Sequence, residues 1–351
     1  MNDYSDRLRK SNIFRQTYIL RPCNYGKVIT DNLPTVKVNS HDLDLYTEIE
    51  PLKELIPLMH KVFLTLIVEF PKWLKRGKFI KYGCGVFFQI ARMKFDQVLK
   101  MINKRKSIAS DRESLSQLKN DIKEYAQDMG FICGFTKVDR RFIAKGGDAF
   151  FPYNNAVVLG MEMSKELLDE VPRPGKRLFD FEIYIKAGFL VFKVAKFIKE
   201  KGFKCHIRIP FDGHVKYPPH AIMAGLGELG AQGVVITREY GPRVRWCMIS
   251  IDAEIEPDSP VNLNMNEYCD ACRLCIRSCP GKAISDERLW WRGVYKRKIN
   301  DSRCYPYFRK YAGCGICIKV CPICQYGYDE CMKAYREDGV ILRKRICNGE
   351  S

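Results

Sequence analysis

The chain has 351 residues, 46% of which are hydrophobic, and its formal net charge is +18. This composition excludes a wholly disordered chain, because enough apolar side chains are present to form a sizeable core, and the length fits two or three domains. The longest apolar run, over 55–70, is interrupted by His60, Lys61 and Glu69, so we expect no membrane span. The first residues contain no apolar signal segment, which makes the cytoplasm the expected compartment.

Residues 1–110 predict an N-terminal arm that leads into helices. Residues 1–50 are polar, whereas 51–106 place apolar side chains close to the 3.6-residue period of a helix. Within 71–106, eleven lysines and arginines stand against a single acid, Asp96. A positive field of this kind attracts nucleic acid, anionic lipid or an acidic protein, although a solvated basic surface explains it equally well. A peripheral membrane contact therefore stays an alternative to a helical cap that packs on the core.

Residues 111–257 predict a core of mixed helices and strands. One helix is expected over 114–129, before Gly130, and a long amphipathic helix over 181–201. Short apolar runs typical of buried strands lie around these helices, at 131–135, 156–159, 205–209, 234–237 and 246–251. The alternation of strands and helices favours an α/β or α+β fold.

A change of composition separates this core from the C-terminal part of the chain. The sequence PDSP at 257–260 predicts a linker. Cysteine, glycine and basic residues then dominate 258–335, and a basic tail is expected over 336–351.

The cysteines of the C-terminal part point to metal rather than to disulfides. Ten of the sixteen fall between Cys269 and Cys331, and in a cytoplasmic chain such a concentration is more often a metal site. In bacterial two-cluster ferredoxins, three closely spaced thiolates surround one [4Fe–4S] cluster and a fourth, before proline, binds the other. That spacing is present as Cys269-x2-Cys272-x2-Cys275-x3-Cys279-Pro280. Zinc is the alternative, although zinc ribbons usually pair two CxxC units.

A second motif lacks one of the closely spaced cysteines and reads Cys314-x2-Cys317-x3-Cys321-Pro322. Cys304 is the natural candidate to complete it. The crossed ligation of two-cluster ferredoxins predicts two sets of ligands. The first cysteine set is Cys269, Cys272, Cys275 and Cys321; the second cysteine set is Cys279, Cys304, Cys314 and Cys317. Cys324 and Cys331 are left over and are expected to be free thiols, with Cys324 as the alternative for a misplaced ligand.

A glycine-rich stretch over 224–233 precedes the cysteine motifs. Gly225, Gly227 and Gly230 fit the pattern G-x-G-x-x-G, and Asp252 follows about 20 positions later. No clear strand precedes the glycines and a strand-like run follows them, so a dinucleotide site is not expected. Close approach of the backbone to a ligand and a tight turn are the two interpretations.

The aromatic and basic residues between the two motifs also allow two interpretations. Trp290, Trp291 and Arg292 are followed by Lys296, Arg297 and Lys298. Such interleaving suits single-stranded nucleic acid, but it equally suits a lid that shields the clusters from solvent. We favour the lid.

Several strings of the chain together resemble a known family. The string GLGELGAQGVVITREYGPRVR, from Gly225 to Arg245, is followed by NEYCDACRLCIRSCPGKAI, RCYPYF and CGICIKVCP. In order and spacing, over about residues 130–322, these strings resemble the cobalamin-dependent reductive dehalogenases, whose core is shared with the tRNA-modifying epoxyqueuosine reductase. The resemblance implies an α+β fold with a nitroreductase-like α/β corrinoid-binding core. A helical N-terminal region would precede that core, and a C-terminal ferredoxin-like domain with two [4Fe–4S] clusters would follow it.

The resemblance also implies which residues meet the corrinoid. Electrons would pass through the clusters to the corrinoid cobalt. The glycine stretch would lie along the corrin or its nucleotide tail, with Gly225, Gly227, Glu228, Gly230 and Gly233 as the binding residues. Dehalogenases usually carry an arginine where this chain has Ala231, and epoxyqueuosine reductases carry a lysine in that neighbourhood. Neither cation is present here.

The proton donor is a further expectation from the resemblance. Tyr184 falls near the place of the dehalogenase tyrosine, with a tyrosine at the helix surface as the alternative. For the aspartate of the epoxyqueuosine type, Asp180 lies nearby and Glu182 would be a substitute of different length. The histidines before the glycine stretch could touch a ligand, although core or surface histidines are commoner; they are His206, His214 and His220.

Three functions follow from these expectations. The first is a cytoplasmic reductase that takes electrons from reduced ferredoxin or flavodoxin and reduces a small organic substrate, halogenated or not. The second is tRNA modification of the epoxyqueuosine type, which the net charge of +18 favours. The third is an electron carrier or corrinoid-reducing activator without a small substrate, which the missing cation at Ala231 favours.

Overall fold

The computed structural model describes residues 112–143, 151–172, 181–210, 215–291, 294–311 and 313–343. The expectations for 1–110, including the basic segment 71–106, lie outside the described residues, as do those for Asp180, His214 and Arg292. Among the described helices, none is both long enough and apolar enough to cross a membrane.

An antiparallel sheet of four strands, in the order β1–β2–β6–β3, forms the centre of the first half. The strands are β1 (Phe131–Lys137), β2 (Asn155–Glu162), β3 (Cys205–Arg208) and β6 (Val244–Ile251). β2 and β6 are buried on both faces, which explains why they are continuous apolar runs in the sequence. The strands predicted at 131–135, 156–159, 205–209 and 246–251 are thereby confirmed.

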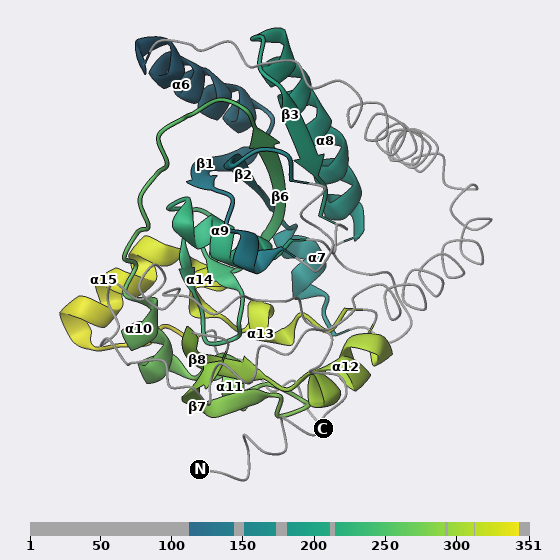
Figure 1. Cartoon of the computed structure of the whole chain (residues 1–351). Helices are drawn as coiled ribbons and strands as arrows, with labels where there is room; N and C mark the ends of the chain where they lie inside the picture. Colours follow the sequence, from purple (N-terminus) through teal and green to yellow (C-terminus); the bar gives the residue numbers. More distant parts are fainter. Residues whose placement is uncertain are drawn as a thin grey trace.

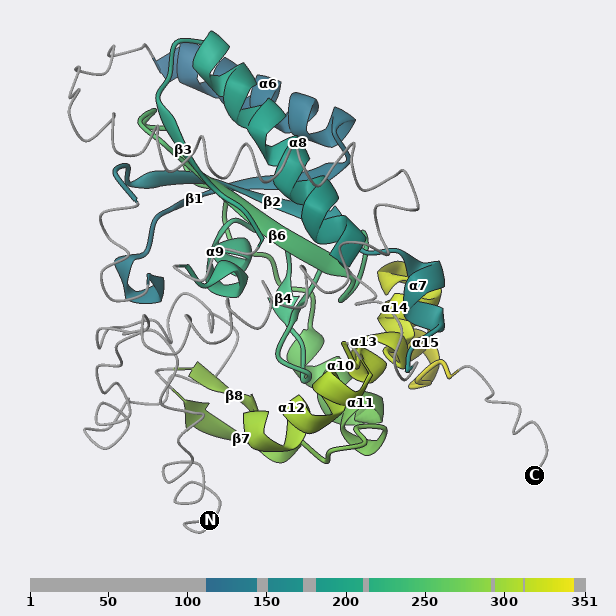
Figure 2. The same ribbon diagram turned by 90° about the vertical axis from the view of Figure 1, so that its right-hand side faces the viewer.

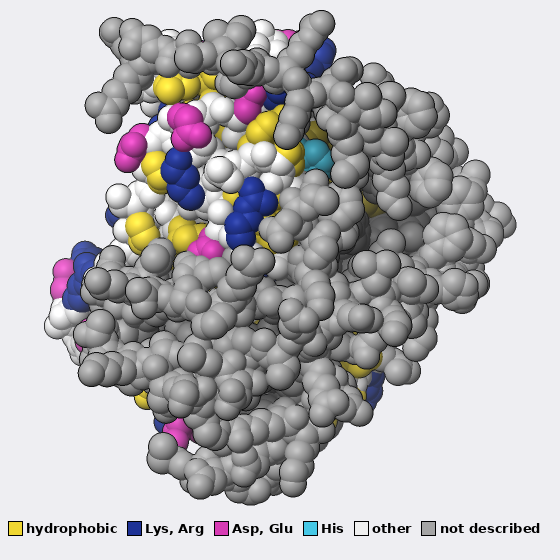
Figure 3. All heavy atoms as spheres, in the orientation of Figure 1, with side chains coloured by type: hydrophobic (Ala, Val, Ile, Leu, Met, Phe, Trp, Pro, Cys, Tyr) yellow, Lys and Arg dark blue, Asp and Glu magenta, His cyan; other side chains and the backbone are white. Residues whose placement is uncertain are grey.

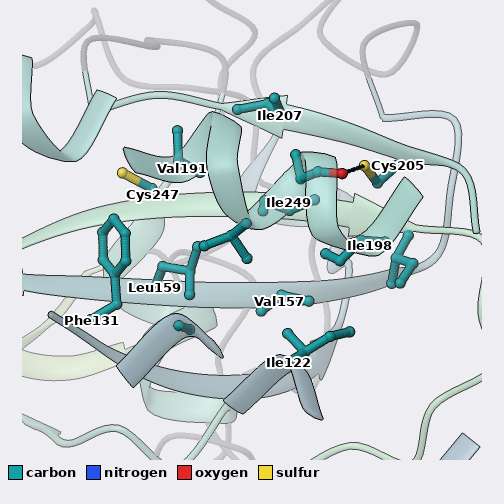
Figure 4. Packing of buried hydrophobic residues seen from close by; sticks show 14 of the residues in the cluster. Ile122, Phe131, Val157, Leu159, Val191, Ile198, Cys205, Ile207, Cys247 and Ile249 are labelled. Atoms are coloured by element: carbon teal, nitrogen blue, oxygen red, sulfur yellow. Dashed lines mark hydrogen bonds between the residues drawn. The ribbon is translucent and has the colours of Figure 1, made fainter. Parts of the chain in front are cut away.

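Two helices cover one face of this sheet: α6 (Arg112–Asp128) and α8 (Phe181–Glu200). Because side chains alternate along a strand, Val157 and Leu159 point toward these helices, where they meet Ile122 and Ile198 (Figure 4). All four side chains are fully buried, and each such burial stabilises the fold by about 1.5–3 kcal/mol.

The opposite face of the sheet is covered by α9 (Tyr217–Met223). Ala221 and Ile222 pack there on Trp246 and Met248 of β6. After α9 the glycine stretch forms a small antiparallel hairpin, β4 (Glu228–Leu229) and β5 (Val235–Ile236), with its tip at 230–234. Figures 1 and 2 show this hairpin reaching from the sheet toward the cysteine-rich half.

Short elements make up the cysteine-rich half. Its helices are α10 (Met265–Cys272), α11 (Leu274–Arg277), α12 (Asp301–Lys310), α13 (Ile316–Lys319), α14 (Pro322–Tyr326) and α15 (Tyr328–Asp338). A hairpin of β7 (Ile284–Trp291) and β8 (Val294–Ile299) lies between α11 and α12. Helices this short rarely fold alone, so their positions depend on tertiary contacts.

The two halves share one apolar cluster, in which Met163, Leu168 and Ile236 pack with Met265 and Tyr268. Leu168 lies on the short helix α7 (Lys165–Asp169), and the first half also contains the 3₁₀ turn η2 (Arg140–Phe142). On the part of the surface that Figure 3 shows in colour, basic and acidic side chains are interspersed.

The segment predicted as a linker, 257–260, is fixed to the first half. The Asp258 carboxylate accepts a hydrogen bond from the backbone N–H of Phe135 at 2.9 Å. It also pairs with Lys119 at 2.7 Å and with Lys123 at 2.9 Å. The chain therefore passes from one half to the other through a segment that is tied down, not through a free tether.

Candidate metal centre

The first cysteine set surrounds one hollow. Cys269 and Cys272 of α10, Cys275 of α11 and Cys321 before α14 line this hollow together, and all four are buried. Tyr268, Pro322 and Ile323 add apolar lining. A largely apolar hollow lined by four soft thiolates suits an iron–sulfur cluster.

Backbone N–H groups face these thiols. Ala231 donates to Cys269, Leu274 to Cys272 and Ile276 to Cys275, while Ile323 and Cys324 both donate to Cys321. Burial raises the pKa of Cys269 to about 12 and that of Cys275 to about 11, and these N–H groups act in the opposite direction. Because a thiol must lose its proton to bind metal, such donors favour the ligating thiolate form.

The second cysteine set is brought together around Cys317. Burial raises the pKa of the Cys317 thiol, and the neighbouring charges of Cys304, Cys314 and Cys279 raise it further. Cys279 also accepts a hydrogen bond from the backbone N–H of Ala283 at 3.3 Å. Cys275 contributes to the same effect on Cys317, so the two sets are neighbours.

The two sets differ in exposure. Every cysteine of the first set is a buried residue, whereas the cysteines of the second set are partly exposed residues, although the Cys317 thiol itself is buried. Within the described residues, no three His, Cys, Asp or Glu side chains are placed to share a single metal ion. A zinc ribbon needs four ligands at about 2.0–2.3 Å from one ion, whereas the thiolates of a cubane each bind a different iron. The cysteine spacing in the sequence is what favours a cubane, and the choice of iron–sulfur over zinc stays a prediction.

The tip of the β4–β5 hairpin lies against the first cysteine set. The Ala231 N–H bonds Cys269, and the Gln232 side chain lines the hollow. Gln232 is 5% exposed, and its Nε2 has no hydrogen-bond partner among the described residues. A buried amide donor without a partner beside an apolar, thiol-lined space is what an absent acceptor in that space would leave.

The glycines of the hairpin face the protein itself. A β-carbon on Gly225, whose φ is +72°, would come within 2.4 Å of the Ser259 carbonyl oxygen. A β-carbon on Gly227 would likewise meet the Ile236 carbonyl oxygen, and one on Gly230 would meet the side chains of Gln232 and Ile236. A β-carbon on Gly233 would meet the side chain of Ile299. Close packing of the chain thus accounts for these glycines, and their contact with a corrinoid stays a prediction.

Glu228 has protein partners in the cysteine-rich half. Its carboxylate accepts hydrogen bonds from the backbone N–H of Leu263 at 2.9 Å and of Met265 at 3.2 Å. The side chain of Asn266 donates to it at 3.4 Å. Glu228 therefore holds the start of α10, the helix that carries Cys269, and its contact with a corrinoid stays a prediction. The sequence could not reveal these partners, because they lie 35 to 38 positions away.

Tyr184 is half-buried near the start of α8, and the guanidinium of Arg245 lies 5.0 Å from its ring centre. The preceding residue, Ile183, packs against both the sheet core and the cysteine-rich cluster. Tyr184 therefore lies where the two halves meet. Glu182 is exposed.

The two described histidines have local partners. His220 is fully buried; its Nε2 accepts from the Asp139 N–H at 3.1 Å and its Nδ1 is 2.8 Å from the Lys216 carbonyl oxygen. His206 lies 3.2 Å from an Arg208 nitrogen. His220 is thus a core histidine, as the commoner interpretation had it.

The β7–β8 hairpin is fastened to the cluster helix α10. Arg288 and Arg297 both pair with Asp270, which neighbours Cys269, at 3.1 and 2.9 Å. Ile284 and Ile299 of the same hairpin join the apolar cluster that contains the cysteines. This arrangement favours the lid over the nucleic-acid interpretation.

The leftover cysteines are buried: Cys324 interacts with Arg243, and Cys331 with the Tyr268 hydroxyl.

The sequence and the fold were compared with those of known proteins. No protein-family model matches the chain. Tetrachloroethene reductive dehalogenase of Sulfurospirillum multivorans is 28% identical over 184 residues, covering 48% of this chain and 35% of that protein. The enzyme of the same name from Desulfitobacterium hafniense is 30% identical over 141 residues, covering 40% and 25%. Epoxyqueuosine reductase of Atelocyanobacterium thalassa is 27% identical over 147 residues, covering 36% and 43%.

The chain is thus similar to reductive dehalogenases and to epoxyqueuosine reductases. Among solved structures, a reductive dehalogenase described as informing B12-dependent dehalogenation aligns with a TM-score of 0.58 and 19% identity, over 66% of this chain and 36% of that one. The catabolic reductive dehalogenase NpRdhA aligns with a TM-score of 0.55 and 20% identity, over 62% and 34%. These likenesses show a shared fold. This chain spans only about a third of the tetrachloroethene dehalogenase of Sulfurospirillum multivorans, 35% of its length.

Proposed function

We propose that this chain is an oxidoreductase in which two [4Fe–4S] clusters pass electrons to a corrinoid, where a small organic substrate, halogenated or not, is reduced. The observation that carries the proposal is the contact between the first cysteine set and the tip of the β4–β5 hairpin, through Ala231 and Gln232. The proposed corrinoid segment and the proposed cluster ligands are therefore neighbours.

The difference in exposure suggests the direction of electron flow. The half-buried second set, with Cys279 and Cys304, is open to an external donor, whereas the buried first set faces the hairpin. When bound, the clusters supply one-electron transfer and the corrinoid supplies a strongly reducing cobalt centre. The chain's own contribution is to bury the first set away from bulk water and to donate backbone N–H groups to its thiolates.

Tyr184 is the proposed proton donor. Arg245, 5.0 Å from the ring centre, attracts the negative charge that a tyrosine acquires when its proton leaves. A positioned acid of this kind contributes about 10²–10⁴-fold to a rate. The sequence pattern did not single out Arg245, because its position opposite Tyr184 arises only when β6 packs beside α8.

A second candidate is tRNA modification, since epoxyqueuosine reductases are among the relatives and the net charge is +18. A tRNA substrate would bind through its phosphates, and its affinity would fall steeply with salt. The fastening of the β7–β8 hairpin to α10 counts against that hairpin as the RNA-binding element.

The experiment is anaerobic preparation of the chain, cobalamin reconstitution and quantification of cobalt and iron, followed by turnover with dithionite as reductant. Tetrachloroethene and an epoxyqueuosine-containing tRNA stem-loop are offered separately. Cobalt at one per chain with turnover of the organohalide supports the first function. Turnover of the RNA alone supports the second. Iron without retained cobalt under any condition contradicts both and leaves an electron carrier.

A further inference from the structure

Helix α12 exposes large aromatic side chains beside a proposed cluster ligand. Tyr305 is 43% and Phe308 45% exposed, whereas Cys304 on the same helix is half-buried. Burying apolar rings at the centre of a contact is the commonest source of binding energy between proteins. An exposed aromatic pair next to the more exposed cysteine set therefore resembles a binding surface more than an ordinary helix face.

Cations without acidic partners among the described residues lie on the same helix and on the neighbouring segment 277–282. Arg303 donates to the Lys282 carbonyl oxygen at 3.3 Å, and Lys282 donates to that of Arg277 at 3.2 Å. None of these three, nor Lys310, has a carboxylate within ion-pair distance among the residues that the structure describes. By contrast, Arg273, Arg288 and Arg297 of the same half are all paired with aspartates.

We propose that this surface, defined by Arg303, Tyr305, Phe308 and Lys310 of α12 with Arg277 and Lys282 beside it, docks a small acidic electron-carrier protein. The proposal rests on the proposed function. The carrier would give up one electron and the cluster held by the second cysteine set would gain it, with no bond formed or broken. Opposite charges on the two proteins would speed the encounter and fix its orientation, and the exposed rings would add apolar contact area.

The test is stopped-flow reduction of the iron–sulfur absorbance by reduced ferredoxin, with the double variant Arg303→Glu/Lys310→Glu. We expect the second-order rate constant to fall at least about tenfold at low salt, and the difference from wild type to shrink above roughly 0.5 M salt. Arg303→Gln/Lys310→Gln should fall between the two. The matched control is Lys193→Glu/Lys199→Glu on α8, which makes the same change of net charge on exposed lysines far from α12.

Reduction by dithionite, which needs no docking surface, distinguishes a wrong docking surface from a wrong proposed function. If dithionite reduces all variants as it does wild type, but ferredoxin reduces the α12 and α8 variants equally fast, the docking surface is wrong and the proposed function stands. If dithionite reduces no cluster in wild type, the proposed function fails. Docking is also wrong if an RNA stem-loop or anionic vesicles, and not ferredoxin, lose affinity for the α12 variant.

A separate observation concerns Gln232. Its amide lines the first hollow, and its Nε2 has no partner in the part of the chain that the structure describes. Gly230 leaves room for this side chain, since a β-carbon there would come within 2.6 Å of the Gln232 Oε1. We infer that Nε2 donates a hydrogen bond to a sulfur of the cluster bound by the first cysteine set. Such donors stabilise the more negative, reduced cluster and raise its reduction potential.

The measurement is a redox titration followed by electron paramagnetic resonance, which resolves the two clusters. Gln232→Met should lower the potential of one cluster and leave the other unchanged, and Gln232→Glu should lower it further. Gln325→Leu is the control, because the Gln325 amide already donates to the Lys319 carbonyl oxygen at 2.6 Å. Unchanged potentials in both Gln232 variants, or equal shifts of both clusters, would overturn the inference.

Discussion

Gly281 lies so close to Arg303 that a β-carbon on the glycine would come within 2.3 Å of the Arg303 carbonyl oxygen. The same β-carbon would come within 3.0 Å of the Tyr307 ring. The loop that carries Cys279 and the helix that carries Cys304 thus meet backbone to backbone. Two members of the second cysteine set owe their proximity to the missing side chain of Gly281.

Gly281→Ala should therefore push α12 away and release Cys304 from the second cluster. We expect iron to fall from about eight toward about four per chain, because one cubane is lost and the other stays. Gly188→Ala is the control, since its nearest neighbour would be the Pro210 Cδ at 4.0 Å. Full iron content in Gly281→Ala would show that α12 does not position a ligand.

Glu228 offers a test of how the hairpin supports the first cluster. Glu228→Ala leaves two buried backbone N–H groups unpaired, at a cost of roughly 1–3 kcal/mol for each group in the free energy of unfolding. Glu228→Gln retains an acceptor and should lose less. Anaerobic urea unfolding with iron quantification measures both effects. Equal stability of the Ala variant and wild type would refute the role assigned to this carboxylate.

Variants of Cys321 and Cys324 test which of these two buried cysteines binds a cluster. Cys321→Ala should lose the cluster of the first set, whereas Cys324→Ala should retain about eight irons. The reason is that Cys324 contributes its backbone N–H to Cys321, and alanine retains that group. Iron content and electron paramagnetic resonance report the outcome. Loss of a cluster in Cys324→Ala would make Cys324 a ligand.

Asp258 should stabilise the join between the halves. Burial raises its pKa, but the hydrogen bonds from Lys119, Lys123 and the Phe135 N–H outweigh burial, so the pKa lies below its usual value. A lowered pKa gives stability that is present above the unfolded pKa of about 3.9 and is lost as the pH falls through the folded value. Asp258→Asn should therefore cost about 1–3 kcal/mol of unfolding free energy equally at pH 5 and pH 8.

The exposed Asp128 serves as the control for that measurement, and Asp128→Asn should change the free energy of unfolding little. A difference between Asp258→Asn and wild type that disappears already at pH 5 would mean that the pKa is not lowered.

Tyr184→Phe tests the proposed proton donor. Turnover of the organic substrate should fall about 10²–10⁴-fold while iron and cobalt contents stay at the wild-type level. Tyr125→Phe is the control, because the Tyr125 ring stacks on Phe197 at 4.4 Å, away from the cysteines. Unchanged turnover in Tyr184→Phe would place the acid elsewhere.

The core strands could be predicted because β2 and β6 are buried on both faces and are therefore unbroken apolar runs. The β7–β8 hairpin could not, since Arg288 and Arg297 interrupt its pattern. These arginines are tolerated there because Asp270, far away in sequence, pairs with both. α12 was missed for a similar reason, as Pro306 and a largely polar sequence hide a helix that packs through Gly281.

The candidate site, too, could be predicted from the sequence only in part. Cysteine spacing is a local property, so the two sets could be proposed from the sequence, and the structure gathers the first set around one hollow. Which set is buried and which touches the hairpin depends on contacts such as Ala231 with Cys269, which spacing does not encode. Ligation itself stays a prediction.

Metal analysis of protein purified without oxygen tests the central claim most directly. Two clusters on the two cysteine sets predict about eight irons and eight acid-labile sulfides per chain, a brown colour, and signals of two interacting clusters after reduction. Colourless protein, or zinc bound in place of iron, would contradict the account.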